Sequence, residues 1–242
     1  MKSSMQRFYI KKLEITDGNF MVKDVNIVYQ LVKVLRTRIG QEIILFDWVE
    51  NIDYLCEIID FSKKEIELKL LEKIEKKSEL DFKLNLFQSF PNKLDKIEYI
   101  IQKWIEVWIS SFTFYRSERS QKISITEKKE ERLNKILVEA VEQSGRNIIP
   151  KLCIQNKKKE TLEWESIFLH TKNNKALSLK KYINNVSRFN CLNIYIWPEW
   201  WFSEEEVENF EEKKFSRIHL WNRILRTETA WVVVGFMFAQ ML

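Results

Sequence analysis

Four short polar segments interrupt the apolar pattern of this chain, and two of them stand where a loop could bind an anionic or polar ligand. The segments are FYRSERS (114–120), EAVEQSGR (139–146), WPEWWF (197–202) and LWNRILRTETA (220–230). The last two each follow an expected strand and precede an expected helix, so their free backbone amides could hold a carboxylate, a ribose or a phosphate.

The WPEWWF segment is the most unusual of the four. The apolar run CLNIYI (191–196) predicts a buried strand before it, and Ser203 with Glu206 forms the S-x-x-E pattern of a capping box at a helix start. Ligands of α/β folds usually meet the carboxyl end of the sheet at such a turn, where the backbone must approach them closely. Glycine suits that task best, so three tryptophans in this turn are unexpected.

Composition points in the same direction. The chain holds 4 glycines and 9 tryptophans in 242 residues, whereas average usage of about 7% glycine would give roughly 17. The simplest interpretation is a glycine-poor lineage that favours tryptophan. Apolar content of 45% and charged content of 31% are typical of a globular protein, and the length allows one large domain or two smaller ones.

Other bulk features exclude several classes of protein. The longest apolar stretch, WVVVGFMFAQML, is too short to cross a bilayer and predicts a buried final helix. The first residues soon become charged and do not resemble a signal peptide. Cys56, Cys153 and Cys191 include no C-x-x-C pair, which favours a reducing cytoplasm over a disulfide framework or a zinc site. We therefore expect a cytoplasmic protein that has no membrane partner and binds no metal.

Charge is spread unevenly along the chain. The formal net charge is +5, and residues 1–40 alone carry eight basic and three acidic side chains. This bias indicates a polyanionic partner such as RNA about as well as it indicates an ordinary solvated surface.

The secondary-structure pattern divides the chain in two. Residues 1–72 show short strand-like runs separated by turn signals, which predict a small, mostly β domain in which NIVYQLVKVLR could be a short helix. Lysines and glutamates around residues 73–79 indicate a linker. Residues 80–242 alternate strands with helices, and this order predicts an α/β domain with a mostly parallel sheet.

Together the four polar segments closely resemble the RsmE family of 16S ribosomal RNA uridine-N3 methyltransferases. That family has S-E-R-S after a strand, E-Q-S-G-R at a helix end, G-P-E-G-G-F-S before a capping glutamate cluster, and L-G-x-R-I-L-R-x-E-T-A before the last helix. The corresponding segments are Ser117–Ser120, Glu142–Arg146, Trp197–Ser203 and Leu220–Ala230. The V-L-R at residues 34–36, followed by Gly40, is similar to the family's RNA-binding barrel. The resemblance covers nearly the whole chain.

The resemblance implies a fold and an assembly. Residues 1–72 would form a PUA-like β-barrel that binds RNA, and residues 80–242 a SPOUT methyltransferase domain with a carboxyl-terminal trefoil knot. The cofactor would be S-adenosylmethionine, and the partner would be 16S rRNA in the small ribosomal subunit. SPOUT proteins are typically homodimers, and the apolar last helix favours a dimer through the carboxyl domain.

The resemblance also implies site residues. Arg119, Arg226 and Lys103 would orient the anionic base and its phosphates, and Glu199 or Glu228 would accept the N3 proton or hold the ribose. For each of them a structural ion pair or helix cap is an equally open role, and His170 and His219 are better explained as packing residues than as bases. The implied cofactor contacts are Leu169, Trp197, Pro198, Glu199, Trp200, Trp201, Leu220, Trp221, Arg223, Ile224, Leu225, Glu228 and Ala230. The implied RNA contacts are Arg7, Lys33, Arg36, Arg38, Arg116, Arg119 and Arg146.

The departures from the family pattern share one feature. Tryptophan stands at family glycine positions 48, 108, 197, 200, 201 and 221, at a small-residue position, 104, and at residue 231 in a tightly packed helix start. UGA differs from the glycine codon GGA by one base, and bacterial lineages read it as glycine or as tryptophan. We therefore predict UGA-encoded glycines translated as tryptophan. The alternative is a genuine protein whose cofactor site is blocked and which binds RNA without catalysis.

Overall fold

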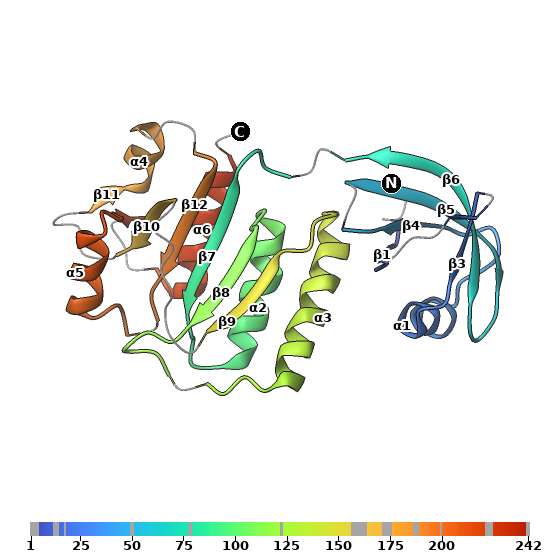
Figure 1. The fold of residues 1–242 in the computed structure, drawn as a ribbon, viewed down its shortest axis with the longest axis horizontal. Helices are drawn as coiled ribbons and strands as arrows, with labels where there is room; N and C mark the ends of the chain where they lie inside the picture. Colours follow the sequence, from blue (N-terminus) through green and yellow to red (C-terminus); the bar gives the residue numbers. More distant parts are fainter. Residues whose placement is uncertain are drawn as a thin grey trace. The chain divides into compact units, whose positions relative to one another are not determined.

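The computed structural model describes the chain except for residues 1–4, 12–14, 17, 49–50, 77–78, 122, 156–163, 171–175, 186–188, 199, 221–224 and 241–242. Of residues 15, 16 and 228 only the backbone is described. The chain divides into two compact units, Met1–Ser78 with Val141–Ile149, and Glu79–Ala140 with Pro150–Leu242 (Figure 1).

The first unit is a curled six-stranded sheet with one short helix (Figure 1). Its strand order is β1-β4-β5-β6-β3-β2, and only the β1–β4 pair is parallel. Register shifts in the long β5–β6 pair bend the sheet, as β-bulges do. The elements are β1 (Arg7–Tyr9), β2 (Ile15–Thr16), β3 (Asn19–Val22), α1 (Val25–Tyr29), the π-helical turn η1 (Gln30–Val34), β4 (Glu42–Phe46), β5 (Ile52–Phe61) and β6 (Ile66–Glu75).

One apolar cluster forms the core of this unit. It includes Phe8, Phe20, Leu31, Leu45 and Ile58, which come from β1, β3, η1, β4 and β5 and are at most 2% exposed. The alternating burial of β3 and β4 places one face of the sheet on this cluster. The mostly β prediction for this part of the chain and the helix in NIVYQLVKVLR are confirmed.

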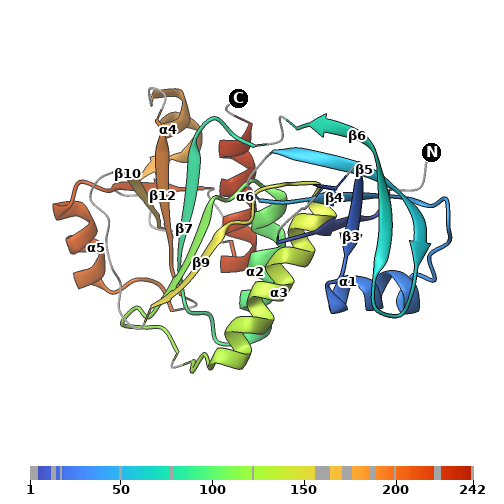
Figure 2. The same cartoon turned by 45° about the vertical axis from the view of Figure 1, so that its right-hand side comes forward.

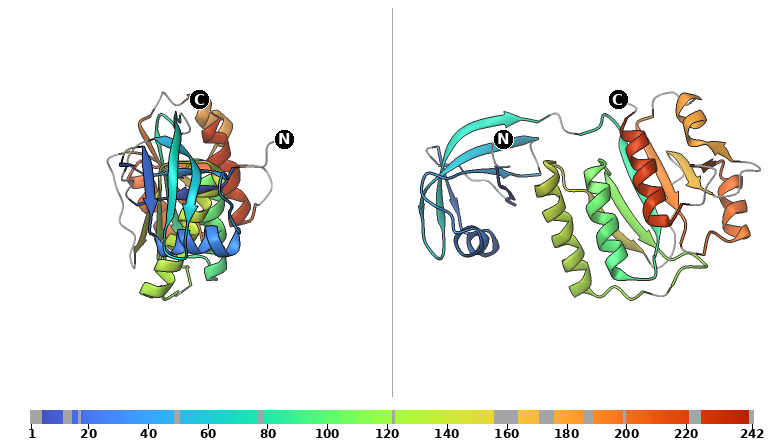
Figure 3. Two further views of the ribbon diagram at one scale, coloured as in Figure 1. Left: turned by 90° about the vertical axis from the view of Figure 1, so that its right-hand side faces the viewer. Right: turned by 180° about the vertical axis from the view of Figure 1, so that it is seen from behind.

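The second unit is an α/β layer structure whose seven strands pair only in parallel. The strand order is β11-β13-β10-β12-β7-β8-β9. Helices α2 and α6 lie side by side against one face of the sheet (Figures 2 and 3). The strands are β7 (Lys83–Ser89), β8 (Ser111–Tyr115), β9 (Lys151–Gln155), β10 (Glu165–Leu169), β11 (Leu177–Ser178), β12 (Cys191–Ile196) and β13 (Ser216–His219). The helices are α2 (Leu94–Glu106), α3 (Glu127–Ser144), α4 (Leu179–Asn185), α5 (Glu204–Glu212) and α6 (Thr227–Ala239).

The sequence pattern explains the central strand of this sheet. All six residues of β12 are buried, because a parallel strand covered on both faces needs a continuous apolar run and not an alternating one.

The last helix, α6, begins at Thr227, and Arg226 is its N-cap residue. The part of the chain that the structure describes contains no helix with the length and apolar character needed to cross a membrane.

The structure differs from the sequence expectations in three details. Strand β6 continues to Glu75, so the first three residues of the expected linker, 73–79, belong to the sheet. The end of α3 and the residues that follow it, 141–149, group with the first unit. Strand β11 and helix α4 carry no clear periodic signal and were not expected.

Candidate active site at the carboxyl ends of the parallel strands

The strand order creates a switch point beside β7. From β7 the chain continues to β8 and β9 on one side, and it later returns to place β12 and β10 on the other side. Ligands of open α/β sheets bind at such a switch point, outside the carboxyl ends of the strands. The loops that follow β8, β10 and β12 leave the sheet at this end.

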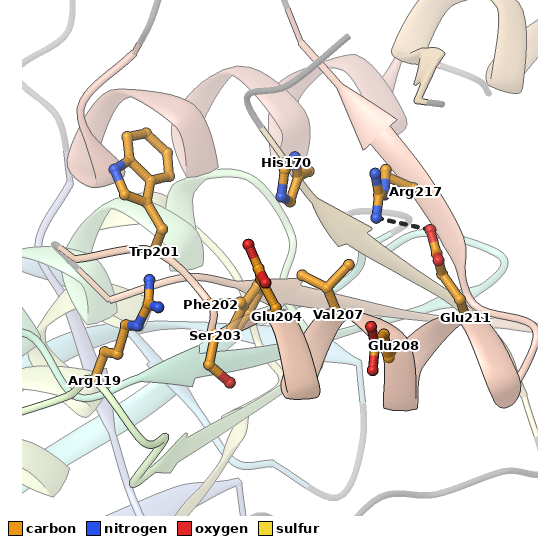
Figure 4. Close-up of a pocket in the computed structure, with 10 residues that line it drawn as sticks. All are labelled: Arg119, His170, Trp201, Phe202, Ser203, Glu204, Val207, Glu208, Glu211 and Arg217. Atoms are coloured by element: carbon orange, nitrogen blue, oxygen red, sulfur yellow. Dashed lines mark ion pairs between the residues drawn. The ribbon is translucent and has the colours of Figure 1, made fainter. Parts of the chain in front are cut away.

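A pocket of about 440 Å³ opens among these loops, a volume within the usual range for small-ligand sites. Figure 4 shows Arg119 and Trp201 at one end of the pocket and Arg217 with Glu211 at the other. The lining residues are Arg119, His170, Trp201, Phe202, Ser203, Glu204, Val207, Glu208, Glu211 and Arg217.

The turn between β12 and α5 forms one wall of the pocket. The Gln88 side-chain amide at the end of β7 donates to the Trp197 carbonyl at 3.3 Å, and the Trp201 amide donates to the Pro198 carbonyl at 3.1 Å. Ser203 then opens α5: its hydroxyl accepts from the Glu206 amide at 3.1 Å, and the Glu206 carboxylate accepts from the Ser203 amide at 2.9 Å. The predicted capping box is confirmed.

The loop that carries Arg119 is held from two sides. The Ser117 hydroxyl lies 2.5 Å from the Ser89 hydroxyl at the end of β7, and the Glu118 amide donates to Glu206 Oε1 at 3.3 Å. Burial, together with the Glu206 charge, raises the pKa of Tyr115 well above its ordinary value, so this phenol stays neutral beneath the loop. The geometry directs the exposed Arg119 side chain toward the pocket (Figure 4).

The far end of the pocket was missed by the sequence reasoning. Arg217 on β13 pairs with Glu211 on α5 at 2.7 Å, and its guanidinium lies 5.8 Å from the Phe168 ring centre. His170 packs edge-on against Phe168 and also lines the pocket. No local motif marks Arg217, Glu208 or Glu211, because ordinary strand and helix patterns contain them.

The tryptophans occupy conformations and spaces that suit smaller residues. Trp108 and Trp201 have φ values of 63° and 64°, in the left-handed region that bulky residues rarely adopt. The Trp197 and Trp201 rings lie 5.0 Å apart, and Trp200 is 67% exposed. The turn therefore accommodates its indoles by packing two together and leaving the third in solvent.

A second pair of indoles fills the layer between α2 and α6. Trp104 and Trp231 are fully buried, with ring centres 5.9 Å apart. Neither indole N–H has a hydrogen-bond partner among the described residues, which is unfavourable for a buried donor. Beside them, a Cβ at Gly235 would lie 2.9 Å from Val107 and 3.0 Å from Trp104, so this layer has no spare room.

Among the expected cofactor contacts in the described part of the chain, only Trp201 lines the pocket. Trp197, Pro198, Leu169 and Ala230 are buried. Leu220 and Leu225 are half-buried, and Arg226 is the N-cap residue of α6. The expected contacts Glu199, Trp221, Arg223 and Ile224, and the Glu228 side chain, lie outside the described part of the chain.

Lys103, which we expected to hold the substrate, does not line the pocket. It lies near the end of α2 and bonds to Glu106 at 2.7 Å, and that hydrogen bond raises the pKa of the lysine. Its place on the exposed side of α2 supports the structural role that the sequence left open.

Two of the arginines expected to contact RNA lie largely inside the first unit, with the Arg7 side chain 9% exposed. Arg7 donates to Asp53 and to Asn147, each at 2.6 Å, and its guanidinium lies 4.7 Å from the Phe46 ring centre. Arg146 is 3% exposed. Asp53 is almost fully buried, and a buried carboxylate is unfavourable unless a cation pairs with it. Arg7 therefore stabilises the fold by pairing with Asp53. The expectation that Arg7 and Arg146 face RNA is corrected accordingly, whereas Lys33, Arg36, Arg38 and Arg116 are exposed.

Comparisons with known proteins agree with this architecture. Residues 78–238 match the family described as RNA methyltransferase domain, and residues 31–71 match the RNA methyltransferase PUA domain. The fold and the site thus define a two-domain RNA methyltransferase.

Two relatives and one solved structure narrow the class of RNA methyltransferase to one family. The ribosomal RNA small subunit methyltransferase E of Buchnera aphidicola (Acyrthosiphon pisum) is 31% identical over 94% of this chain and 90% of its own. The Bacillus subtilis protein of the same name is 29% identical over 93% of both chains. A crystal structure of the Neisseria gonorrhoeae enzyme bound to S-adenosyl methionine aligns with a TM-score of 0.81, 25% identity and coverage of 98% and 95%. The chain belongs to the ribosomal RNA small subunit methyltransferase E family, RsmE.

Proposed function

We propose that this protein transfers a methyl group from S-adenosylmethionine to N3 of a uridine in 16S rRNA. The observation that carries the proposal is the pocket among the loops after β8, β10 and β12. It lies at the switch point of a domain whose match to RNA methyltransferases spans residues 78–238. The Neisseria gonorrhoeae relative was crystallised with S-adenosyl methionine, which supports the same cofactor here.

Different residues of this chain would bind the cofactor, orient the uracil and accept its proton. The backbone of residues 197–201 would hold the cofactor, with Leu169, Leu220, Leu225 and Ala230 as apolar walls. When bound, the cofactor supplies an electrophilic methyl group. Arg119 would orient the uracil as its N3 loses a proton, and much of the acceleration would come from this positioning. Glu199 or Glu228 would take that proton, and Arg226 would contact the phosphates.

The indoles of Trp197 and Trp201 would hinder cofactor binding by this loop, because they occupy the space beside its backbone. We infer that glycine is the native residue at positions 197, 200, 201 and 221, encoded by UGA. Three observations support this inference: the left-handed φ of Trp201, the same φ region at Trp108, and the indole N–H groups of Trp104 and Trp231, which have no hydrogen-bond partner among the described residues. Reading the nine codons tests it: UGA at most of them is expected, and UGG at 197, 200 and 201 contradicts it.

If the tryptophans are genuine, the second candidate function is an RNA-binding module that has lost catalysis. It keeps the basic first unit and loses the cofactor. RNA binding that weakens with salt fits both candidates, whereas methyl transfer fits only the first.

Assembly and topology follow from the family in the same proposal. The proposal includes a trefoil knot in the carboxyl-terminal domain, as in the family. Phe236 on the apolar α6 is 53% exposed, which supports a two-fold dimer through this domain. Buried Cys56 and Cys191, both free thiols, suit the cytoplasm. A monomer mass by light scattering at micromolar concentration would contradict the dimer.

The decisive experiment compares small-subunit rRNA from cells with and without the gene. A methyl group on N3 blocks the Watson–Crick edge of uridine, so reverse transcription stops at the modified base. One stop is expected to disappear with the gene and to return when the gene, decoded as in its native host, is restored. Identical stop patterns in all three samples would reject the methyltransferase proposal.

A further inference from the structure

Gln88 is a buried polar side chain in apolar surroundings. It lies near the carboxyl end of β7 and is 0% exposed, and its neighbours across the sheet are Ile196 on β12 and Phe114 on β8, both also fully buried. Glutamine is mostly exposed in proteins, because an amide that leaves water loses the hydrogen bonds that it made there. A glutamine at this position, beside the switch point of the sheet, is therefore unfavourable unless its amide makes specific contacts.

The Gln88 amide makes such contacts through its nitrogen. Its Nε2 donates to the Ser89 carbonyl at 2.8 Å and to the Trp197 carbonyl at 3.3 Å. Carbonyl oxygens only accept, so the nitrogen and not the oxygen of the amide must face them. Its Oε1 is buried and has no hydrogen-bond partner among the described residues. A buried acceptor without a partner destabilises a fold, so stability by itself gains little from glutamine here.

Asn85, earlier on the same strand, is an amide that the sheet uses completely. Its Nδ2 donates to Asn193 Oδ1 at 3.1 Å and to Cys191 Sγ at 3.0 Å, and its Oδ1 accepts from the Ser111 hydroxyl at 2.7 Å. These bonds join β7 to β12 on one side and to β8 on the other. The comparison separates a side chain that serves the sheet, Asn85, from one whose donor serves the turn after β12, Gln88.

The Trp197 carbonyl that Gln88 holds is the first carbonyl of the turn between β12 and α5. The next residue is Pro198, whose nitrogen carries no hydrogen. The peptide group between the two residues therefore has no donor, and only its carbonyl oxygen can fix it by a hydrogen bond. Further along, the Trp201 amide donates to the Pro198 carbonyl at 3.1 Å, and Ser203 ends the turn in the capping box of α5. Gln88 and the capping box thus hold the two ends of the turn.

We propose that Gln88 is a positioning residue for the cofactor: by holding the Trp197 carbonyl, it keeps the backbone of residues 197–201 in the shape that binds S-adenosylmethionine. The inference rests on the function proposed above, in which this backbone holds the cofactor. A turn that is already fixed loses less conformational entropy when a ligand binds, so the affinity is higher. Gln88 is not among the residues that line the pocket, so it acts through the turn.

Gln88→Met tests the donor, because methionine is similar in length and has no hydrogen-bond donor. The variant is made in the chain with glycine at positions 197, 200, 201 and 221. The KM for S-adenosylmethionine is expected to rise about fivefold, the effect of one neutral hydrogen bond. The value of kcat should stay within about twofold, because the turn binds the cofactor alike in the ground state and the transition state. The Tm should stay within about 4 °C, because the unsatisfied acceptor is removed together with the donor.

Asn85→Ala is the matched control on the same strand. It removes an amide that is bonded at both ends, so it is expected to lower the Tm by more than about 4 °C and to leave the KM for the cofactor unchanged. The two variants should therefore show opposite effects on stability and on cofactor affinity. A KM that is unchanged in Gln88→Met, or that rises equally in both variants, would overturn the proposal.

Amide hydrogen exchange in the original chain tests the positioning of the turn without any cofactor. Gln88→Met is expected to speed exchange of the Trp201 amide about fivefold or more, because its acceptor, the Pro198 carbonyl, is no longer held in place. The α5 amides from Val207 onward should exchange as before. Unchanged exchange at Trp201 would overturn the proposal. A glycine-containing chain that does not bind S-adenosylmethionine by calorimetry would instead reject the proposed function, and exchange at Trp201 would still decide whether Gln88 holds the turn.

Discussion

The Glu206 carboxylate accepts a hydrogen bond from the Glu118 amide at 3.3 Å, although the two residues are 88 positions apart in the chain. The same carboxylate closes the capping box at the start of α5. One side chain thus joins the loop that carries Arg119 to the turn that forms one wall of the pocket. We therefore expect Glu206 to hold Arg119 in position.

Glu206→Ala is therefore expected to lower kcat about 10-fold or more, because an arginine displaced by an ångström loses much of its effect. The measurement is methyl transfer at saturating substrates, in a chain with glycine at positions 197, 200, 201 and 221. In an Arg119→Ala background, Glu206→Ala is expected to lower kcat little further, because the arginine that it positions is already absent. A purely structural role for Glu206 would give the same kcat loss in both backgrounds. Ser62→Ala is the matched control, since Ser62 also accepts from two backbone amides, far from the pocket. An equal kcat loss in both backgrounds would contradict the positioning role.

Cofactor affinity is expected to depend on the indoles of the turn. Calorimetry should give at least about 10-fold tighter S-adenosylmethionine binding when glycine replaces tryptophan at positions 197, 200, 201 and 221, because overpacked side chains no longer compete for the space. Glycine at Trp48 and Trp164, which are 57% and 47% exposed, is the control and should change nothing. Equal, tight binding by the original chain would mean that the cofactor lies elsewhere.

The backbone at Trp108 should prefer glycine over alanine. Both Trp108→Gly and Trp108→Ala remove the indole, but only glycine adopts a φ of 63° without strain. The glycine variant is expected to be more stable by about 1 kcal/mol in urea unfolding. Gln102, an exposed position inside α2, is the control. There Gln102→Ala should be more stable than Gln102→Gly by about 1 kcal/mol, because glycine destabilises a helix interior. Equal stability of the two variants at position 108 would rule out a left-handed backbone there.

Arg7 is expected to matter for folding and not for RNA. Arg7→Met leaves Asp53, which is 1% exposed, with only the Lys76 ammonium at 3.2 Å, and it should cost about 3 kcal/mol of unfolding free energy. Arg38→Met, at an exposed position, should change stability by less than about 0.5 kcal/mol and instead weaken RNA binding. A salt slope of RNA binding that falls in folded Arg7→Met would contradict this division.

The features that the sequence determined by itself are those set by neighbouring residues. The run CLNIYI and the S-x-x-E pattern predicted β12, the turn after it and the start of α5, because periodicity and capping depend on spacings of two to four residues. The alternation of strands and helices predicted the parallel sheet for the same reason. Four ordered motifs were enough to identify the family.

Tertiary structure alone decided which charged side chains face solvent and which lie inside. Arg7 and Lys33 are equally basic in sequence, yet Arg7 meets Asp53 and Asn147, 46 and 140 positions away, while Lys33 meets no described acidic partner. Arg217 reached the pocket only because β13 pairs with β10 and α5 crosses beside it. Burial and electrostatic pairing depend on residues brought together by the fold, and no local pattern carries that information.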